Sequence, residues 1–334
     1  MSRIWIVIVN YGTADLTIDC LRALSSQVAC IADIRAVVVD NNSGDGSVAK
    51  LVAAIEREGW ISWAEVMPQD KNGGFAFGNN AGIRKALASA EPVEYIMLLN
   101  PDTVARPGAI EALVNFMDDH PNAGIAGSEL ENADGSVEYS AHTFPSPLGE
   151  LDGVARLGPL NRLLWRKAAA ATPSQETAHL CDWVSGASMI FRRKVFEDVG
   201  LMDEAYFLYF EEVDICRRAH QAGWQCWYVP GSRVIHLEGA STGIRTVARR
   251  RAAYWYESRR RFFVKNYGVS GLVVADVFWA VRQLSFTIRK RLNFGAGSGV
   301  DIDPKWYMFD LLWGDLRAIL TGRVWRIRLA GLKA

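Results

Sequence analysis

The stretch FLYFEEVDICRRAHQAG (207–223) contains three acidic side chains that could act as a general base, Glu211, Glu212 and Asp214. Asp214 stands four residues before Arg218, the spacing of an ordinary stabilising pair on a helix. Helix stabilisation does not explain the two adjacent glutamates, which stand among aromatic residues. Apolar surroundings of this kind raise the pKa of a carboxylate. A carboxylate tuned in this way suits the removal of a proton from a hydroxyl, as glycosyl or phosphoryl transfer requires.

The turn Asn100-Pro101-Asp102 places another carboxylate directly after the apolar run YIMLL (95–99). Asn-Pro-Asp is ordinary turn chemistry, because proline fixes φ and Asx side chains bond back to their own backbone. Asp102 also offers the oxygen ligand that Mg²⁺ or Mn²⁺ accepts when substrate phosphates complete the metal shell. From these residues alone, a turn and a metal ligand both remain open.

His236, at the end of the run SRVIHL, is a candidate for a second metal ligand. A single histidine is usually a satisfied surface or core residue, but a neutral imidazole also binds divalent cations. A mixed shell of Asp102, His236 and a diphosphate would suit Mn²⁺ or Mg²⁺.

A glycine-rich stretch, KNGGFAFGNNAG (71–82), precedes a helical pattern. It matches neither the dinucleotide-binding fingerprint nor the P-loop. Its glycines could let the backbone approach a flat or phosphorylated ligand, or they could form a turn capped by asparagines.

Short apolar runs alternate with helical patterns over the first 125 residues. The expected strands are 4–10, 36–40 and 95–100, and the expected helices are 13–27, 47–58, 82–90 and 107–118. This alternation predicts an α/β fold with a mostly parallel sheet covered on both faces. Ligands of such sheets bind beyond the carboxyl ends of the strands. Polar residues follow all three expected strands, so we expect one pocket there; they are Asn10, Asp40-Asn41-Asn42 and Asn100-Pro101-Asp102.

The pattern is less regular between residues 126 and 180, where a hairpin is expected around Asp134-Gly135. Further elements are expected from residue 181 onward: strands at 183–191 and 226–237, and helices at 194–199 and 211–222.

Composition narrows the class of protein. Half of the 334 residues are hydrophobic, as in a globular chain. The five cysteines form no CxxC pair, which argues against a disulfide framework or a cysteine zinc site and favours a reducing compartment. No signal peptide and no apolar stretch of ~18 residues is recognisable, so we expect a cytoplasmic protein without a membrane span.

The zero net charge hides two opposite halves. Residues 1–244 carry 19 Lys and Arg against 31 Asp and Glu, and residues 245–334 carry 18 against 6. The basic part is helical in pattern, and its arginines are interleaved with aromatic residues, as in TVARRRAAYWYESRRRFFVKNYG (246–268). Such amphipathic helices suit an anionic membrane surface, so we expect peripheral attachment to the inner face of the cytoplasmic membrane. A solvated packing helix is the alternative, and nucleic acid is disfavoured because no nucleic-acid motif is present.

Six segments of the chain, taken in sequence order, resemble the family 2 glycosyltransferases of GT-A fold. The resemblance covers about residues 3–265 and is strongest with the rhamnosyltransferase-like branch. The six segments are VIVNYGTADLTIDCL, VVVDNNSGDGS, NGGFAFGNNAGI, LLNPDT, WVSGASMIFRRKVFEDVGLMDEAYFLYFEEVDICRR and VIHLEGAST. The resemblance implies a GT-A catalytic domain at 1–244, with a nucleotide-binding half (1–125) and an acceptor and catalytic half (126–244), followed by a basic helical tail (245–334).

The resemblance also implies roles for single residues. Nucleotide and donor binding falls on Asn10, Tyr11, Asp40, Asn42, Asn72, Gly74, Phe75, Asn80, Asn100 and Asp102. Acceptor and sugar binding falls on Trp183, Ser185 and Gly186, metal binding on Asp102 and His236, and the catalytic base on Glu212.

Two positions depart from the usual family pattern. Asn100 replaces the first aspartate of the DxD form, although an Asn-Pro-Asp form is familiar in this branch. Glu212 stands where aspartate is usual, which moves the carboxylate outward by ~1.5 Å and keeps Glu211 and Asp214 open as alternative bases.

The activity that the resemblance implies is a metal-dependent single displacement with inversion. A nucleotide-diphospho-sugar would be the donor, with dTDP-L-rhamnose expected, and a cell-surface glycan or lipid-linked hydroxyl the acceptor. Two alternatives are a nucleotidyltransferase of similar architecture and a non-catalytic nucleotide- or carbohydrate-binding protein. The first lacks the expected Gly-rich signature with a basic residue near the first strand, and the second is favoured only by Glu212.

Overall fold

The computed structural model describes residues 3–28, 33–151, 176–237, 250–291 and 306–331. The chain divides into two units. Unit 1 comprises residues 1–144 and 174–245, and unit 2 comprises residues 145–173 and 246–334. The division of the catalytic part into a nucleotide-binding half and an acceptor half stays a prediction.

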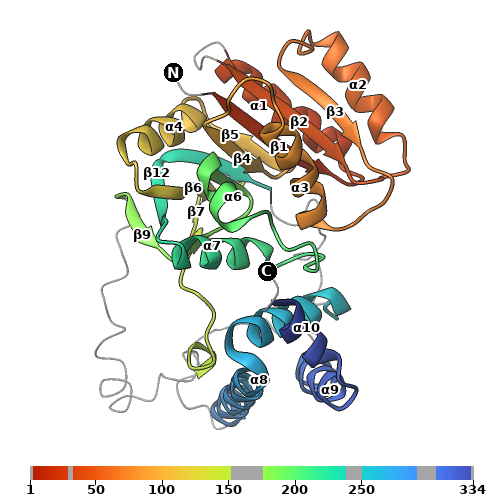
Figure 1. The fold of residues 1–334 in the computed structure, drawn as a ribbon, viewed down its shortest axis with the longest axis vertical. Helices are drawn as coiled ribbons and strands as arrows, with labels where there is room; N and C mark the ends of the chain where they lie inside the picture. The colour runs from red at the N-terminus through yellow and green to blue at the C-terminus, as the bar shows by residue number, and fades with distance from the viewer. Residues whose placement is uncertain (1–2, 29–32, 152–175, 238–249, 292–305, 332–334) are drawn as a thin grey trace. The chain divides into compact units, whose positions relative to one another are not determined.

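Unit 1 is built on one large sheet whose strand order is β3-β2-β1-β4-β11-β6-β12-β5, with β7 beside β6 and β9 beside β12 (Figure 1). Strands β1, β2, β3, β4, β6 and β12 run in one direction. The mostly parallel sheet predicted from the sequence is therefore confirmed. The strand bounds are β1 (Ile4–Asn10), β2 (Ile34–Asp40), β3 (Ala64–Pro68), β4 (Tyr95–Leu99), β5 (Thr103–Ala105), β6 (Ala123–Glu131), β7 (Val137–Glu138), β9 (His179–Cys181), β11 (Ser188–Arg192) and β12 (Gln225–His236).

Helices cover both faces of this sheet because its strands are apolar on both sides. On one face, α1 (Ala14–Val28), α2 (Ser47–Arg57) and α4 (Ala109–Asp119) pack on residues such as Ile6 of β1. On the other face, α3 (Phe75–Leu87), α6 (Arg193–Val199) and α7 (Glu211–Gln221) pack on residues such as Val7. The alternation of side chains along β1 sends neighbouring residues into two separate cores.

Helix α3 begins at Phe75, so the expected start near residue 82 was wrong. The glycines inside the helix allow close packing on β1: a Cβ at Gly78 would lie 2.8 Å from Val9 Cγ1, and a Cβ at Gly82 would overlap the side chain of Val7. These glycines are needed for the close contact between helix and strand. Because they lack side chains, the apolar periodicity that would predict a helix is weak over this segment.

Three other expectations needed correction. The run 183–191 is not one strand but two, β10 (Trp183–Val184) and then β11. Strand β10 pairs with β8 (Ala141–His142). Strand β6, AGIAGSELE, was missed because its small residues lack the usual β-branched pattern. The short strands β3 and β5 were missed as well. The hairpin around Asp134-Gly135 is confirmed, with Leu130 paired to Glu138 across it.

The described part of unit 2 is mainly helical, which confirms the predicted C-terminal helices. It contains α8 (Ala253–Arg291), which is interrupted by non-helical Gly268, then α9 (Tyr307–Leu320) and α10 (Arg323–Gly331), with a short 3₁₀ turn at Gly149–Leu151. Its aromatic core includes Tyr256, Trp279 and Tyr307. Residues 238–249, which contain the end of VIHLEGAST and the start of the basic motif, lie outside the described residues. Within the described helices, none is both long enough and apolar enough to cross a membrane.

Candidate active site at the carboxyl ends of the strands

The first part of the site is a buried polar pair at the ends of β1 and β2. Asn10 and Asp40 are partners in the parallel register, and Asn10 Nδ2 donates to Asp40 Oδ2 at 2.7 Å. Asp40 also accepts from the backbone N–H and the hydroxyl of Ser43, while Asn10 Oδ1 accepts from the hydroxyls of Thr13 and Thr17. These two predicted nucleotide-binding residues thus brace the loops that leave both strands.

Asn41 links those strand ends to the glycine-rich segment, a role that the sequence interpretation missed. Its buried Nδ2 donates to Asn72 Oδ1 at 3.2 Å and to the carbonyl of Gly74 at 2.9 Å. The sequence signal for this role was the position of Asn41 between Asp40 and Asn42, two predicted nucleotide-binding residues. Asn42 adopts a left-handed backbone (φ 60°) and donates to the carbonyl of Asp70.

Tyr11 follows Asn10 and is 55 % exposed. An aromatic side chain so open to solvent at a strand end is available for contact with a flat ligand. This agrees with its predicted place by the nucleotide, which stays a prediction.

The glycine-rich segment and the loop before α7 touch through their backbones. Phe75 N–H donates to the carbonyl of Phe207 at 2.8 Å. Gly74 has φ +90°, and a Cβ there would overlap the same carbonyl oxygen. Only glycine combines this φ with so close an approach.

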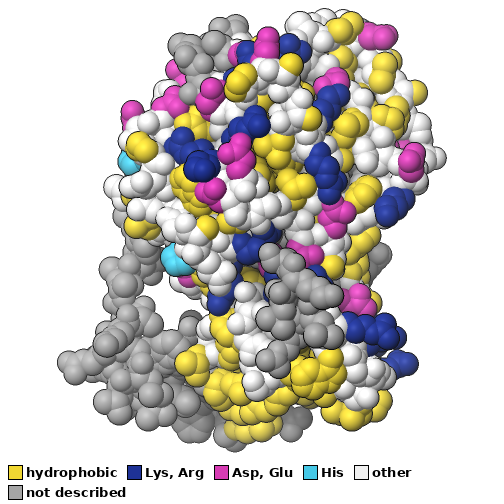
Figure 2. Space-filling model, in the orientation of Figure 1, with side chains coloured by type: hydrophobic (Ala, Val, Ile, Leu, Met, Phe, Trp, Pro, Cys, Tyr) yellow, Lys and Arg dark blue, Asp and Glu magenta, His cyan; other side chains and the backbone are white. Residues whose placement is uncertain are grey.

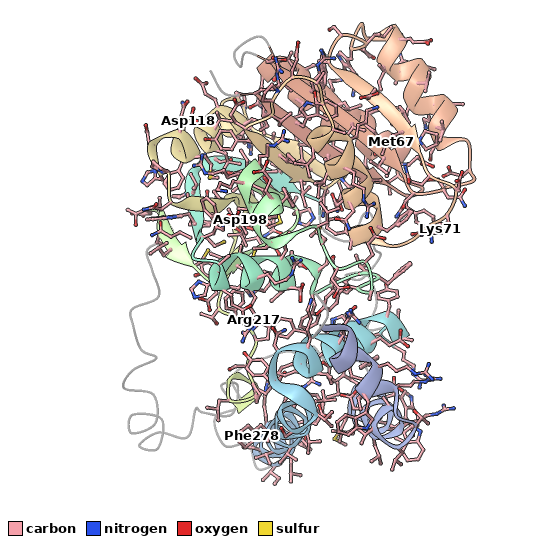
Figure 3. The ribbon with its side chains drawn as sticks, in the orientation of Figure 1. Met67, Lys71, Asp118, Asp198, Arg217 and Phe278 are labelled. Atoms are coloured by element: carbon pink, nitrogen blue, oxygen red, sulfur yellow. The ribbon has the colours of Figure 1, made fainter. Side chains whose placement is uncertain are left out.

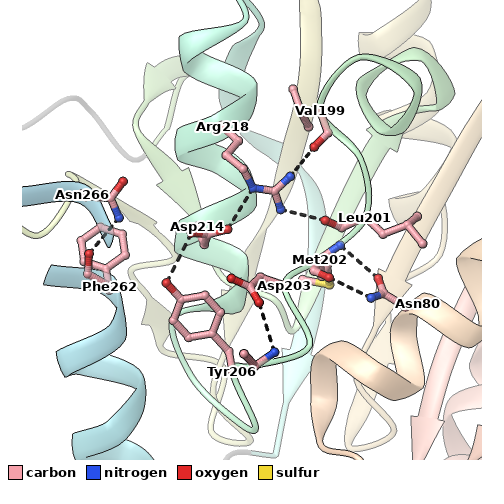
Figure 4. Close-up of polar contacts among 11 residues, drawn as sticks. Asn80, Val199, Leu201, Met202, Asp203, Tyr206, Asp214, Arg218, Phe262 and Asn266 are labelled. Atoms are coloured by element: carbon pink, nitrogen blue, oxygen red, sulfur yellow. Dashed lines mark hydrogen bonds and ion pairs between the residues drawn. The ribbon is translucent and has the colours of Figure 1, made fainter. Parts of the chain in front are cut away.

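Asn80 fastens the same loop from inside α3 (Figure 4). Its Nδ2 donates to the carbonyl of Met202 at 2.8 Å, and its Oδ1 accepts from the N–H of Met202 at 3.0 Å. The Asn80 Nδ2 group also donates to Glu204 Oε1 at 2.9 Å. Asn80 thereby positions the loop that leads into the acidic helix, and its predicted donor contact remains untested.

The three acids of α7 occupy different environments. Asp214 Oδ2 accepts from Arg218 Nε at 2.9 Å and Oδ1 accepts from Tyr206 OH at 3.3 Å, while the guanidinium also donates to the carbonyls of Val199 and Leu201 (Figure 4). Asp214 is therefore engaged in a buried ion pair that ties α7 to the preceding loop. Arg217, one position earlier, instead projects from α7 (Figure 3). Its guanidinium carbon lies 5.5 Å from the centroid of the Phe144 ring.

Glu211 and Glu212 begin α7, next to two residues with unusual backbone angles. Tyr209 and Phe210 both have φ 71°, a conformation that costs bulky residues about 1–3 kcal/mol and concentrates at functional sites. Burial raises the pKa of Glu212 to about 7. Burial and then the neighbouring charge of Glu212 raise the pKa of Glu211 well above its usual range.

Glu212 differs from Glu211 in its access to solvent. Glu211 is 2 % exposed, whereas Glu212 is partly exposed. Within the described part of the chain, the buried Oε2 atoms of both glutamates have no hydrogen-bond partner, so exposure of the side chain is what distinguishes them. A desolvated carboxylate on a partly exposed side chain, with no ion pair to a cation among the described residues, is suited to accept a proton near neutral pH.

Gly186 is the point at which the predicted donor, acceptor and base residues meet. A Cβ at Gly186 would lie 3.5 Å from Phe75 Cε1 and 3.8 Å from Glu212 Cβ. The chain before it is held by the N–H of Ser185, which donates to the carbonyl of Ser140 at 3.0 Å. Trp183 lies against His142, with ring centroids 4.3 Å apart, and its indole N–H donates to the carbonyl of Thr143. A flat aromatic pair of this kind can receive a sugar face.

Asp102 and His236 are brought together by strand pairing. β12 runs antiparallel to β5 with His236 opposite Thr103, and Leu237 N–H donates to the Asp102 carbonyl. His236 Nε2 lies 3.6 Å from Asp102 Oδ1, and His236 Nδ1 lies 4.0 Å from Glu138 Oε2. Glu138 was missed from the sequence because it belongs to a two-residue strand without a motif.

These donors suit a cation that is shared with a substrate. Carboxylate and imidazole face each other across the pair, and the buried Asn100 Oδ1 in the same turn has no hydrogen-bond partner among the described residues. No three His, Cys, Asp or Glu side chains in the described ranges are grouped closely enough to hold a metal ion by themselves. The arrangement fits a divalent ion whose remaining ligands come from phosphate oxygens.

Comparisons with known proteins show the family of the chain. Residues 2–258 match the family described as Glycosyltransferase like family 2. The chain is 32 % identical over 276 residues to an N-acetylglucosaminyl-diphospho-decaprenol L-rhamnosyltransferase of Mycobacterium tuberculosis, covering 80 % of this chain and 86 % of the relative. It is 25 % identical to the dTDP-rhamnosyl transferase RfbF of Shigella flexneri, over 87 % of this chain and 90 % of the relative.

Solved structures show the fold. The mannosyltransferase PcManGT from Pyrobaculum calidifontis, in complex with GDP-Man and Mn²⁺, has a TM-score of 0.53 at 13 % identity and covers 99 % of this chain and 84 % of its own. Residues 1–349 of TarS from S. aureus have a TM-score of 0.51 at 13 % identity, covering 96 % and 82 %. The predicted GT-A fold is confirmed.

Proposed function

Because this chain belongs to the glycosyltransferase family 2, we propose that it transfers L-rhamnose from dTDP-L-rhamnose to a hydroxyl of a lipid-linked or cell-surface glycan acceptor. The enzyme class follows from the family. The sugar is supported by the names of two relatives that cover most of the chain, and a lipid-linked acceptor is supported by the first of them. The family match argues against the nucleotidyltransferase alternative.

The observation that carries the proposal is the meeting of Gly186, Phe75 and Glu212 at the start of α7. In the proposed reaction, Glu212 takes the proton from the acceptor hydroxyl. The hydroxyl oxygen then bonds to the anomeric carbon as the bond from that carbon to the diphosphate breaks. A single displacement inverts the anomeric centre, and the proton ends on Glu212.

Glu212 suits the base better than its neighbours do. Asp214 is held by Arg218 and Tyr206, and Glu211 is almost fully buried. The partly exposed Glu212, whose pKa is raised by burial to about 7, is half ionised near neutral pH.

Asp102 and His236 would hold Mn²⁺ or Mg²⁺, with Asn100 Oδ1 in the same turn as a further oxygen donor. When bound, the metal would offset the charge that builds up on the leaving diphosphate. Glu138 Oε2 lies 4.0 Å from Nδ1, beyond hydrogen-bond distance, and would orient the imidazole only once the two side chains close that gap. A structural neighbour bound to Mn²⁺ supports a divalent ion in this fold.

The donor would lie over the ends of β1 and β2. Tyr11 is exposed beside the buried Asn10–Asp40 pair, and the segment from Asn72 to Phe75 is fixed by Asn41 and by the Phe207 carbonyl. The aromatic pair of Trp183 and His142 would receive the acceptor, with Ser185 and Gly186 beside it.

Unit 2 is the proposed membrane-attachment region. Residues 245–334 carry 12 more basic than acidic residues, 18 against 6, and their described part forms helices rich in aromatic residues. A lipid-linked acceptor would place the reaction at the inner face of the cytoplasmic membrane, and a basic helical unit would be drawn to its anionic lipids.

A panel of nucleotide-sugars tests the donor and the metal together. The full chain is mixed with dTDP-L-rhamnose, UDP-glucose or GDP-mannose, with and without Mn²⁺, and its melting temperature and donor hydrolysis are measured. We expect stabilisation and hydrolysis that need both dTDP-L-rhamnose and Mn²⁺. Full hydrolysis in excess chelator would reject the metal role. Stabilisation without any turnover on donor or acceptor would instead favour a binding protein with a dead site.

A further inference from the structure

The outer side of α9 is apolar, which is unusual for a helix exposed to water. Its inner side packs Tyr307, Leu311 and Ala318 into unit 2. Its outer side repeats large apolar residues every three or four positions, and among them Trp313 is 54 % exposed and Leu320 is 76 % exposed. The outer residues are Trp306, Phe309, Trp313, Leu316 and Leu320. A helix that is apolar on both faces is normally buried on both.

The second part of α8 has the same character. Leu272, Ala275 and Trp279 are buried inside the unit. The exposed positions between and beyond them follow a helical repeat of aliphatic residues, Val273, Val277, Val281, Leu284 and Ile288. Helices α8 and α9 pack together, and Figure 2 shows the hydrophobic side chains of the unit gathered over both. We refer to these two stripes as the apolar surface of unit 2.

This surface is far more extensive than the scattered apolar residues of an ordinary monomer surface. Neither helix accounts for it as a membrane span: α9 has 14 residues, about 21 Å, against a hydrocarbon core of ~30 Å, and no described helix meets the requirements for crossing. A helix of this length and pattern is suited to lie in the plane of the membrane interface.

Four acidic residues of unit 2 form ion pairs with arginines of the unit, whereas Glu257 on α8 is exposed. Arg259 pairs with Asp276 at 2.8 Å and with Glu150 at 3.2 Å, and Arg260 pairs with Asp315 at 2.5 Å. Asp310 is paired with Arg250. These pairs remove negative charge from the surface of the unit.

Basic residues without such an internal role stand at the border of the apolar surface. Arg317 at the end of α9 and Arg323 and Arg326 on α10 are all exposed, next to the half-exposed Trp325. Apolar side chains bordered by arginines and tryptophan are complementary to an interface of acyl chains beneath anionic headgroups.

We propose that the apolar surface of unit 2 inserts into the interface of a bilayer that contains anionic phospholipid. The inference rests on the membrane partner proposed above and sharpens it: burial of apolar side chains holds the protein there, and the arginines select anionic lipid. Attraction by charge alone would need only the arginines, whereas insertion explains why both stripes are apolar.

Vesicle flotation of the full chain tests insertion with three variants. The first carries Trp313→Gln, Leu316→Gln and Leu320→Gln on the apolar surface. The matched control carries Ile61→Gln and Val137→Gln, which are exposed apolar residues of unit 1. The third carries Arg323→Gln and Arg326→Gln. Vesicles of phosphatidylcholine with or without phosphatidylglycerol are used at low salt and at ~1 M salt, where the Debye length is about 3 Å.

Insertion predicts that wild type and control remain on phosphatidylglycerol-containing vesicles at high salt. The apolar variant should lose partitioning by at least about a hundredfold at either salt, because three large side chains no longer leave water. The arginine variant should lose about tenfold or more, mainly at low salt. Unchanged melting temperature and donor hydrolysis in every variant would separate these losses from a damaged fold or a failed catalytic proposal.

Several outcomes would overturn the proposal. If salt releases the wild type and the apolar variant binds equally well, attachment is electrostatic, and the membrane partner survives without insertion. If the wild type binds neither vesicle, both membrane proposals fail. If light scattering shows that the wild type self-associates and that the apolar variant does not, with equal vesicle binding, then the surface is an interface between copies of the chain.

Discussion

His236 Nε2 lies 3.6 Å from Asp102 Oδ1, because the antiparallel pairing of β12 with β5 sets the histidine beside the end of the Asn-Pro-Asp turn. The sequence contains both residues as candidates, but nothing local states that they are neighbours. Their proximity gives the proposed metal site two protein ligands and leaves the rest of the shell to phosphate.

Asp102→Asn is expected to weaken Mn²⁺ binding in the presence of dTDP by more than a hundredfold, since a neutral amide replaces the carboxylate without a change of size. Titration calorimetry measures this directly. Asp119→Asn, an exposed acid at the end of α4, is the control and should bind as the wild type does. Equal affinity in Asp102→Asn would move the metal elsewhere.

Glu138→Gln tests the positioning of His236. Loss of a carboxylate that orients a ligating imidazole typically costs about 10–100-fold in metal affinity. We expect a loss in that range in the same titration, with the melting temperature of the metal-free protein unchanged. A large fall in that melting temperature, without loss of metal affinity, would assign Glu138 to the fold.

Glu212→Gln is expected to lower turnover by about 10²–10⁴-fold, as for removal of a general base, while binding of dTDP is retained. Glu197→Gln, an exposed glutamate on α6, is the control. Glu212→Asp measures the effect of the shorter side chain. Unchanged turnover in Glu212→Gln would transfer the role of base to another group.

The pH profile should report the same carboxylate. A base must be ionised to act, so kcat/KM should rise with pH through about 7 and then level off. The pKa of the neighbouring Glu211 carboxyl is also raised, by burial and then by the charge of Glu212. A profile that is flat from pH 5 to pH 8 would contradict the raised pKa of Glu212.

The free energy of unfolding should fall as pH rises, in the opposite direction to kcat/KM. The pKa of Glu212 is about 7 in the folded state against 4.5 when unfolded, so the folded state binds more protons between these values. Its contribution to the free energy of unfolding is therefore present below about pH 4.5 and is lost as pH rises through 7. Asp276 in unit 2 contributes to the pH dependence of stability with the same sign, because burial raises its pKa to about 7. The free energy of unfolding, measured in urea, should fall less with rising pH in Glu212→Gln than in the wild type.

Gly74→Ala should disrupt the contact between the glycine-rich segment and the loop before α7. Gly135→Ala is a matched control, because Gly135 has a similar φ of +82° but open space around it, whereas a Cβ at Gly74 would overlap the Phe207 carbonyl. Gly135→Ala should cost about 1–2 kcal/mol of backbone strain, and Gly74→Ala more, because φ 90° with ψ −177° is a conformation open essentially to glycine alone. Only Gly74→Ala should also weaken dTDP binding. Equal effects on binding would show that the close approach to Phe207 is not needed.

Local pattern was sufficient for much of the fold. Apolar runs such as IWIVIVN and YIMLL specify buried strands, and their polar exits indicated the edge at which the candidate site lies. The physical reason is that periodicity and turn chemistry reside in contiguous residues. Strand β6 and the start of α3 escaped prediction because glycines and alanines there are selected by the neighbours that they pack against.

The candidate site shows the same division. Sequence alone supplied the candidate acids, the turn proposed to bind the metal and the family to which the chain belongs. Only the tertiary structure decided that Asp214 is engaged by Arg218, that Asn80 holds the loop before α7, and that Glu212 faces Gly186. It also decided which side of α9 faces outward, since a helix that is apolar on both sides has the pattern of a core helix in sequence. Such relationships depend on pairing between segments far apart in the chain, and no contiguous pattern encodes them.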